Sequence, residues 1–176
     1  MFLSRLARSF STLRKKPPLY AHENGDKISI SFSKNPQATA IGRFPKSDSE
    51  LLEGLSSELD PFEPMRVLNP KNFEENPEFW PIAQKVLKEN IHICPIFSSL
   101  ATADEAQYFH IYDLRNPPPP NRIPEVDDIL GTVEIVDGKI KKNSFEPNAM
   151  YRPVSPYGAM AVSEEIAAKL AQALYK

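Results

Sequence analysis

The amino-acid sequence predicts an α+β fold, in which a small antiparallel sheet has helices packed on one face and proline-rich extended connections. Short stretches of alternating apolar and polar residues indicate β-strands, and an Asp-Gly pair joins two of them. Apolar residues at spacings of three and four indicate separate helices. The 176 residues include 18 scattered prolines but only 6 glycines, which indicates stiff connections between short elements. A regular βαβ alternation is absent, so a parallel sheet is not expected.

The first sixteen residues differ from the rest of the chain because they carry five basic residues and no acidic one. In a helix, one face would hold Phe2, Leu6, Phe10 and Leu13. An amphipathic start that is rich in Arg and Ser and poor in acids is typical of a mitochondrial transit peptide. The segment from Arg8 to Ser11 resembles a matrix processing site, with Arg8 two residues before the cut. We predict that residues 1–10 are a transit peptide cleaved between Phe10 and Ser11. The alternative is a basic helix that stays attached and docks on a surface.

Removal of residues 1–10 would take away two arginines and no acid, and would change the net charge from −2 to −4. A mildly acidic protein lacks the clustered basic face that nucleic-acid binding needs, so we predict no direct DNA binding. No apolar run approaches the ~20 residues that span a bilayer, so we predict no membrane span. We expect a soluble protein of the mitochondrial matrix. Residues 11–24 would be a flexible arm, and residues 25–176 a single α+β domain.

A hairpin and a helix are predicted at the start of this domain. Lys27–Ser33 alternates with period two, which predicts a half-buried strand, and Ala38–Phe44 would be its return strand. Ser47 and Glu50 fit a capping box, in which side chains satisfy the free N–H groups of a first helical turn. The leucines that follow predict a helix that continues to Leu59.

The strongest helical pattern comes after residue 76. Its apolar positions recur at three- and four-residue spacing and comprise Phe79, Ile82, Ala83, Val86, Leu87 and Ile91. Pro81 is compatible with a helix only in the first turn, where its missing N–H would have no partner in any case. We therefore predict regular helix from about Phe79.

The second half of the chain combines predicted strands with proline-marked crossings. Tyr108–Leu114 has a strand pattern. Ile129–Val136 and the residues from Lys139 form the clearest hairpin, because Asp137-Gly138 supplies the positive φ of a two-residue turn. Ser163 is predicted to cap a final helix, whose buried stripe is Ile166, Ala167, Leu170 and Leu174.

Pro117–Pro120 lies between two predicted strands and has two interpretations. A PxxP segment can dock in an aromatic groove of a partner. Such ligands usually lie in exposed polar segments, however, and four prolines span only about 12 Å at ~3.1 Å per residue. We interpret the run as a structural strap at the edge of the domain. The charges near it, from Asp113, Arg115 and Arg122 to the acids after Pro124, are expected to neutralise each other.

The sequence contains none of the common phosphate-binding, metalloprotease, hydrolase or CxxC motifs, so we predict no catalytic residue, no cofactor and no metal site. Two alternatives are a zinc site and a catalytic triad. His92 and Cys94 would need further ligands, such as His110 and His22, to bind zinc. Ser98 or Ser99 with His110 and Asp113 would form a triad only by chance, because the spacing gives no support. We interpret Cys94 as a buried thiol.

Several aromatic and arginine side chains are predicted to form an interface. In the strand from Tyr108, alternation places Tyr108, His110 and Tyr112 on one face, with Phe109 and Ile111 on the other. Aromatic residues and Arg are enriched in interface cores, although packing under a helix would explain them equally well. The predicted interface residues are Tyr108, His110, Tyr112, Arg115, Arg122, Tyr151 and Arg152.

Three functions remain open, and a non-catalytic one is preferred. The first is an accessory or structural subunit that binds other mitochondrial proteins in a larger complex. The second is an enzyme or small-molecule-binding domain, which would need a concave apolar pocket beside His110. The third is a protein-held component of a mitochondrial ribonucleoprotein, for which Lys139, Lys141 and Lys142 are the only dense basic group after residue 16. These lysines also suit the protection of an edge strand, which is the interpretation we prefer.

Overall fold

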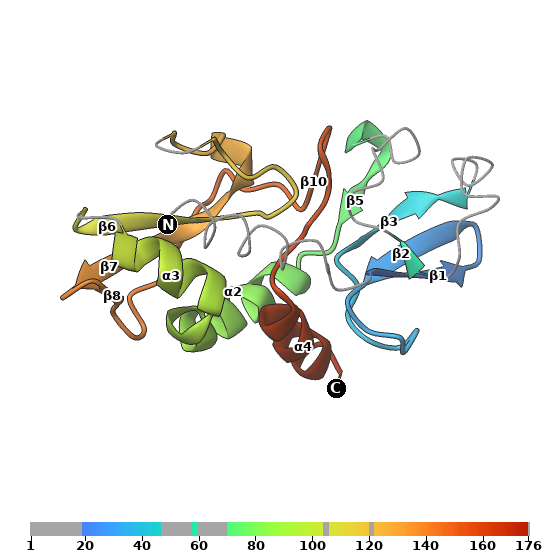
Figure 1. Cartoon of the computed structure of the whole chain (residues 1–176). Coiled ribbons are helices and arrows are strands. Elements are labelled where there is room, and N and C mark those ends of the chain that lie inside the picture. The colour runs from blue at the N-terminus through green and yellow to red at the C-terminus, as the bar shows by residue number, and fades with distance from the viewer. Residues whose placement is uncertain (1–18, 47–57, 60–69, 104–105, 120–121, 176) are drawn as a thin grey trace.

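The computed structural model describes residues 19–46, 58–59, 70–103, 106–119 and 122–175. Figure 1 shows two small antiparallel sheets on either side of helices α2 (Phe79–Asn90) and α4 (Glu164–Ala173). The predicted α+β class is confirmed, but the strands divide between separate sheets. Within the part of the chain that the structure describes, no helix is long and apolar enough to cross a bilayer.

The first sheet has five strands in the order β4-β1-β2-β3-β5, and all its pairs are antiparallel. The strands are β1 (Leu19–Asn24), β2 (Lys27–Ser31), β3 (Gly42–Pro45), β4 (Glu58–Leu59) and β5 (Glu74–Glu75). The predicted period two holds over Lys27–Ile30, where Ile28 and Ile30 are buried and Lys27 and Ser29 are half-buried, but Ser31 is also fully buried and the strand ends there. The predicted hairpin partner is also found, but β3 begins only at Gly42. The residues before it form a connection that is tied to the C-terminal helix, since Thr39 N–H donates to the Leu174 carbonyl over 3.0 Å.

Two expectations for this half need correction. The predicted flexible arm ends earlier than expected, because Leu19–Asn24 forms β1, pairs with β2 and buries Leu19 completely. The helix predicted from Ser47 cannot extend to Leu59, because Glu58–Leu59 pairs with β1 as β4. The outer edge of β1 offers backbone partners there, and this pairing takes the place of a last helical turn. The rest of that helix, its capping box, the transit peptide and residues 11–18 lie outside the described residues.

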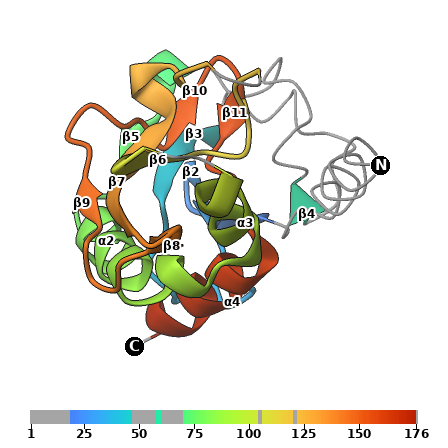
Figure 2. The same ribbon diagram turned by 60° about the vertical axis from the view of Figure 1, so that its left-hand side comes forward.

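The second sheet contains β6 (Tyr108–Tyr112), β7 (Ile129–Val136), β8 (Lys139–Ile140) and β9 (Glu146–Pro147). The predicted hairpin between β7 and β8 is confirmed, since Asp137 and Gly138 have φ values of 52° and 69°. A Cβ atom on Gly131 of β7 would collide with the Glu146 carbonyl and the Phe145 ring, so glycine is needed for this close approach. A separate hairpin, β10 (Val154–Ser155) with β11 (Gly158–Ala159), lies at the opposite end of the molecule from α4 (Figures 1 and 2).

Among the α-helices of the described residues, α2 and α4 were predicted. Helix α2 begins at Phe79, and the Ser163 hydroxyl accepts a hydrogen bond from Ile166 N–H at the start of α4. Helix α3 (Pro95–Ala103) was not predicted, because serines and threonine interrupt its apolar pattern. Its first residue is a proline, as suits a first turn. The described residues also form the 3₁₀-helices η2 (Pro70–Asn72), η3 (Ile91–Ile93) and η4 (Val126–Asp128).

A single apolar core joins both sheets to the helices. Its largest fully buried side chains include Phe44 and Ile30 from the first sheet, Ile111 from the second, and Phe79 from α2. Cys94 is buried in this core, as expected, and its thiol lies 3.4 Å from the Ser163 hydroxyl at the start of α4.

Candidate functional site

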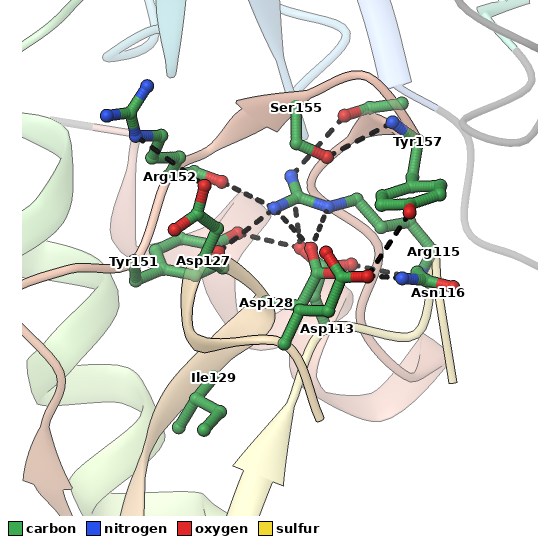
Figure 3. Close-up of polar contacts among 12 residues, drawn as sticks. Asp113, Arg115, Asn116, Asp127, Asp128, Ile129, Tyr151, Arg152, Ser155 and Tyr157 are labelled. Atoms are coloured by element: carbon green, nitrogen blue, oxygen red, sulfur yellow. Dashed lines mark hydrogen bonds and ion pairs between the residues drawn. The ribbon is translucent and has the colours of Figure 1, made fainter. Parts of the chain in front are cut away.

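The densest group of buried polar side chains lies where β6 ends and η4 leads into β7. Asp113 and Arg115 follow β6, and Asp128 is the last residue of η4. Their side chains are 0%, 0% and 1% exposed, respectively. We call these three residues and Tyr151 the buried ionic cluster (Figure 3). Charged groups this deep are tolerated only when they are paired and hydrogen-bonded.

The guanidinium of Arg115 uses all three of its nitrogens. Nε donates to Asp128 Oδ1 over 2.8 Å, and Nη2 lies 2.7 Å from the same oxygen. Nη1 lies 3.6 Å from Asp113 Oδ2 and donates to the Gly158 carbonyl over 3.3 Å. Nη2 also donates to the carbonyls of Arg152, over 2.7 Å, and Asp127, over 3.2 Å. Lysine has no such planar fork, so Arg115 satisfies a geometry that lysine could not.

Asp113 is held entirely by donors. Its Oδ1 accepts from the backbone N–H groups of Arg115 and Ala161, both over 2.9 Å. Its Oδ2 accepts from the Tyr151 hydroxyl over 2.8 Å. Because every partner donates, these hydrogen bonds favour the charged form of the carboxyl.

Burial and charge act in opposite directions on these groups. Burial raises the pKa of Asp113 and outweighs the nearby Arg115 charge and the three donors, which lower it. For Arg115 burial is the largest single effect and lowers the pKa, but the neighbouring Asp113, Tyr151 and Asp128 together raise it more. Burial, followed by the Asp113 charge, raises the pKa of Tyr151 well above its usual value. Tyr151 is therefore a neutral hydrogen-bond donor at physiological pH.

The buried ionic cluster ties together segments that are far apart in the sequence. It joins residues 113–116, the η4 segment, the crossing at residues 151–152, and β11 with the two residues that follow it (Figure 3). Arg115 and Tyr151 were predicted as interface residues, and this was wrong: both are buried, and Tyr151 also stacks on Trp80 at 4.8 Å. Their polar groups are engaged with each other, so we assign them a structural role.

One signal in the sequence points to this cluster and was missed. Asp113 and Arg115 continue the inward phase of the strand that holds Phe109 and Ile111. A charged residue in the buried phase of a strand needs an oppositely charged partner nearby. The expected neutralisation around the proline run is therefore found for Asp113 and Arg115, but in the interior, whereas Arg122 is exposed.

Apolar side chains gather outside the cluster, on and around η4. We call them the η4 surface; they are Val126, Met150 and Tyr157, with exposed fractions of 52%, 59% and 47%. The Asn148 amide donates to the carbonyls of Val126 and Ile129 over 2.8 and 2.9 Å. Met150 N–H donates to the same side chain over 3.0 Å. Asn148 thus holds the segments of Val126 and Met150 side by side.

The polar rim of this surface is also fixed. The Tyr157 hydroxyl donates to Glu125 over 3.2 Å, which raises the pKa of Tyr157. The exposed side chain of Arg152 lies 3.8 Å from Asp127. Pro117–Pro119 belongs to no helix or strand, and the Asn116 amide anchors its start by donating to Asp128 over 3.0 Å. Pro120 lies outside the described residues, and the strap remains our interpretation.

The predicted face of Tyr108, His110 and Tyr112 has a different environment at each residue. Tyr108 is 60% exposed, and His110 Nδ1 lies 3.0 Å from the Thr132 hydroxyl. Tyr112 is half-buried and packs edge-on against Phe97 at 5.3 Å, and burial raises its pKa. The groove beside Tyr108 has a volume of about 440 Å³ and is open to solvent. Lys141 and Glu134, which line it, form an ion pair at 2.7 Å.

The zinc and triad alternatives are not supported by the positions of their residues. No group of three His, Cys, Asp or Glu side chains could hold a metal ion within the described ranges. His22 bonds to the Ser33 carbonyl over 2.8 Å, and Ser98 donates to the His92 carbonyl over 3.1 Å.

Comparison with protein-family models, with curated proteins and with solved structures gave no match.

Proposed function

We propose that this chain is a non-catalytic protein of the mitochondrial matrix, an accessory or structural subunit that binds other proteins in a larger mitochondrial complex. One observation carries the binding proposal: the η4 surface presents exposed apolar side chains on a backbone that the buried ionic cluster fixes from beneath. The Arg-rich and acid-poor residues 1–10 support the mitochondrial location.

The fixed backbone favours binding because a preordered surface loses little entropy when a partner docks. The Val126 carbonyl is bound by Asn148. The Asp127 carbonyl is bound by the Arg115 side chain and by Arg152 N–H. The η4 surface contains Met150 and Tyr157, and its rim contains Arg152. Met, Tyr and Arg are all enriched in interface cores.

The test is affinity purification of the tagged full chain from gently solubilised mitochondria, comparing wild type with Val126→Asp. We expect wild type to retain a stoichiometric set of partner proteins. We expect the affinity of Val126→Asp for these partners to fall roughly thirtyfold, because an interface hot spot contributes about 2 kcal/mol or more. Val136→Asp is the matched control, since Val136 lies on β7 and is 46% exposed, against 52% for Val126.

The outcomes separate binding from location. If wild type retains no partner, or if Val126→Asp and Val136→Asp lose partners equally, the η4 surface is not the binding site. Sequencing the N-terminus of the purified protein tests the location separately. A start at Ser11 supports import and cleavage, whereas an intact Met1 contradicts the predicted processing.

A further inference from the structure

Strand β6 is an edge strand with unused backbone groups. It pairs on one side with β7, and the described part of the chain places no strand on its other side. Ile135 N–H donates to the Gln107 carbonyl over 2.8 Å, and Asp113 N–H donates to the Asp128 carbonyl over 2.7 Å. Both bonds involve odd-numbered residues. In an antiparallel ladder, the backbone N–H and C=O groups of the odd-numbered residues of β6 therefore point toward β7. The backbone groups of Tyr108, His110 and Tyr112 therefore point outward, where none of the described residues bonds to them.

This edge lacks the usual protection against pairing. Natural proteins protect edge strands with charged residues or proline. β5 consists of two glutamates, β8 contains Lys139, and β9 consists of a glutamate and a proline. β6 has the sequence YFHIY, with no acid, lysine, arginine or proline, and Tyr108 is 60% exposed.

We propose that β6 pairs with β6 of a second copy of this chain, antiparallel across a two-fold axis, and joins two sheets into one. Symmetric pairing is centred on His110, which faces His110 of the second copy, and it places each Tyr108 opposite a Tyr112. Directly opposed aromatic residues stabilise antiparallel pairs. Pairing stops beyond Tyr112, because the next outward N–H, that of Leu114, is already bonded to the Ala161 carbonyl over 2.8 Å.

The charge pattern of the edge strands favours a second copy of this chain as the partner of β6. Like charges directly opposite each other destabilise a strand pair, so β5 with its two glutamates would repel its own copy. β6 contains only neutral side chains and the single histidine, and two-fold dimers are the commonest oligomers. This proposal does not depend on the proposed function, because the η4 surface lies on other elements.

The oligomeric state tests the pairing. Light scattering on the purified full chain, over a range of micromolar concentrations, is expected to give twice the mass of one chain. Tyr108→Lys places a charge at the edge and is expected to halve that mass. Tyr175→Lys is the matched control, because Tyr175 is 64% exposed and lies after α4. It is expected to remain dimeric, and circular dichroism checks that both variants are folded.

Single cysteines test the register. Directly opposed residues in a hydrogen-bonded antiparallel pair have Cα atoms about 5.5 Å apart, within reach of a disulfide. His110→Cys is therefore expected to form a disulfide-linked dimer under mild oxidation. Two copies of Tyr108→Cys would lie four residues apart along the strands, about 14 Å, and should not link to each other. The buried Cys94 is present in both variants and cancels from the comparison.

Three results would overturn the proposal. The first is a monomer at every concentration. The second is a dimer that Tyr108→Lys leaves intact, which would place the interface elsewhere. The third is crosslinking through position 108 instead of 110, which would contradict the register. If the pure chain is monomeric but Tyr108→Lys loses a protein that copurifies from mitochondria, the edge accepts a strand of that protein and self-pairing is wrong.

Discussion

Two ion pairs in this protein have the same length but opposite surroundings. Arg115 Nη2 lies 2.7 Å from Asp128 Oδ1, and Lys27 Nζ lies 2.7 Å from Glu74 Oε2. The side chains of the first pair are 0% and 1% exposed, whereas those of the second are 32% and 56% exposed. Water screens the second pair, while the first has only protein partners. Contact distance alone therefore says little about how much a pair contributes to the fold.

The two pairs also differ in what they connect. The buried ionic cluster joins the end of β6, η4, the crossing at residues 151–152 and strand β11. Lys27 and Glu74 connect only β2 with β5, strands separated by β3 in one sheet. Backbone pairing already joins these strands, from β2 to β3 and from β3 to β5. The segments around the buried cluster have few regular elements, so its side chains supply bonds that a ladder supplies elsewhere.

The largest expected effect comes from Arg115→Met, which leaves Asp113 and Asp128 buried without their cation. Breaking a buried ion pair by removing one partner costs about 3–5 kcal/mol, because an uncompensated charge remains. Urea unfolding followed by circular dichroism should show a large drop in the transition midpoint. Arg152→Met is the matched control, since the Arg152 side chain is 66% exposed and lies 3.8 Å from Asp127. Equal stability of the two variants would contradict the role assigned to the cluster.

The second prediction concerns pH. The contributions of Asp113 and Glu74 to the free energy of unfolding are expected to change in opposite directions as the pH rises. Burial raises the pKa of Asp113 above 3.8, so the folded state binds this proton more tightly than the unfolded state. The contribution of Asp113 to the free energy of unfolding therefore falls as the pH rises from 3.8 through the raised value. The hydrogen bond from Lys27 lowers the pKa of Glu74, so its contribution is instead lost as the pH falls below the ordinary carboxyl value of 4.5.

Urea midpoints measured across this acidic range, for wild type, Asp113→Asn and Glu74→Gln, test these signs. As the pH rises, the urea midpoint of wild type should fall relative to that of Asp113→Asn. The difference for Glu74→Gln should change in the opposite direction and remain small, because Glu74 is in water. If both midpoint differences change with pH in the same direction, burial is not the dominant influence on the pKa of Asp113.

The sequence predicted the elements whose patterns are local. The alternation of Lys27–Ser33, the Asp137-Gly138 turn, the start of α2 and the Ser163 cap all depend on residues close together in the chain. β1 and β4 escaped prediction because their stability comes from pairing with other strands, and α3 escaped because polar residues interrupt its apolar pattern. Tertiary pairing decides such segments, and a single sequence does not display it.

The distinction between local patterns and distant partners also explains which site residues were placed correctly from the sequence. Tyr108 and Arg152 are exposed, and their part in an interface stays a prediction. Arg115 and Tyr151 were misplaced because their partners are 13 and 38 residues away in the sequence: Asp128 for Arg115, and Asp113 for Tyr151. Only folding brings these groups together.

The smallest expected effect is that of Lys27→Met, and it tests the other side of the comparison. This change removes the cation closest to Glu74, but Glu74 stays hydrated and Arg43 remains 3.8 Å away. Exposed pairs contribute little because solvent and salt screen them and because two long side chains must be held in place. We expect the urea midpoint of Lys27→Met to match that of wild type at both low and high salt. A loss approaching that of Arg115→Met would mean that the first sheet depends on this pair despite its exposure, and burial would then no longer explain why the two ion pairs differ.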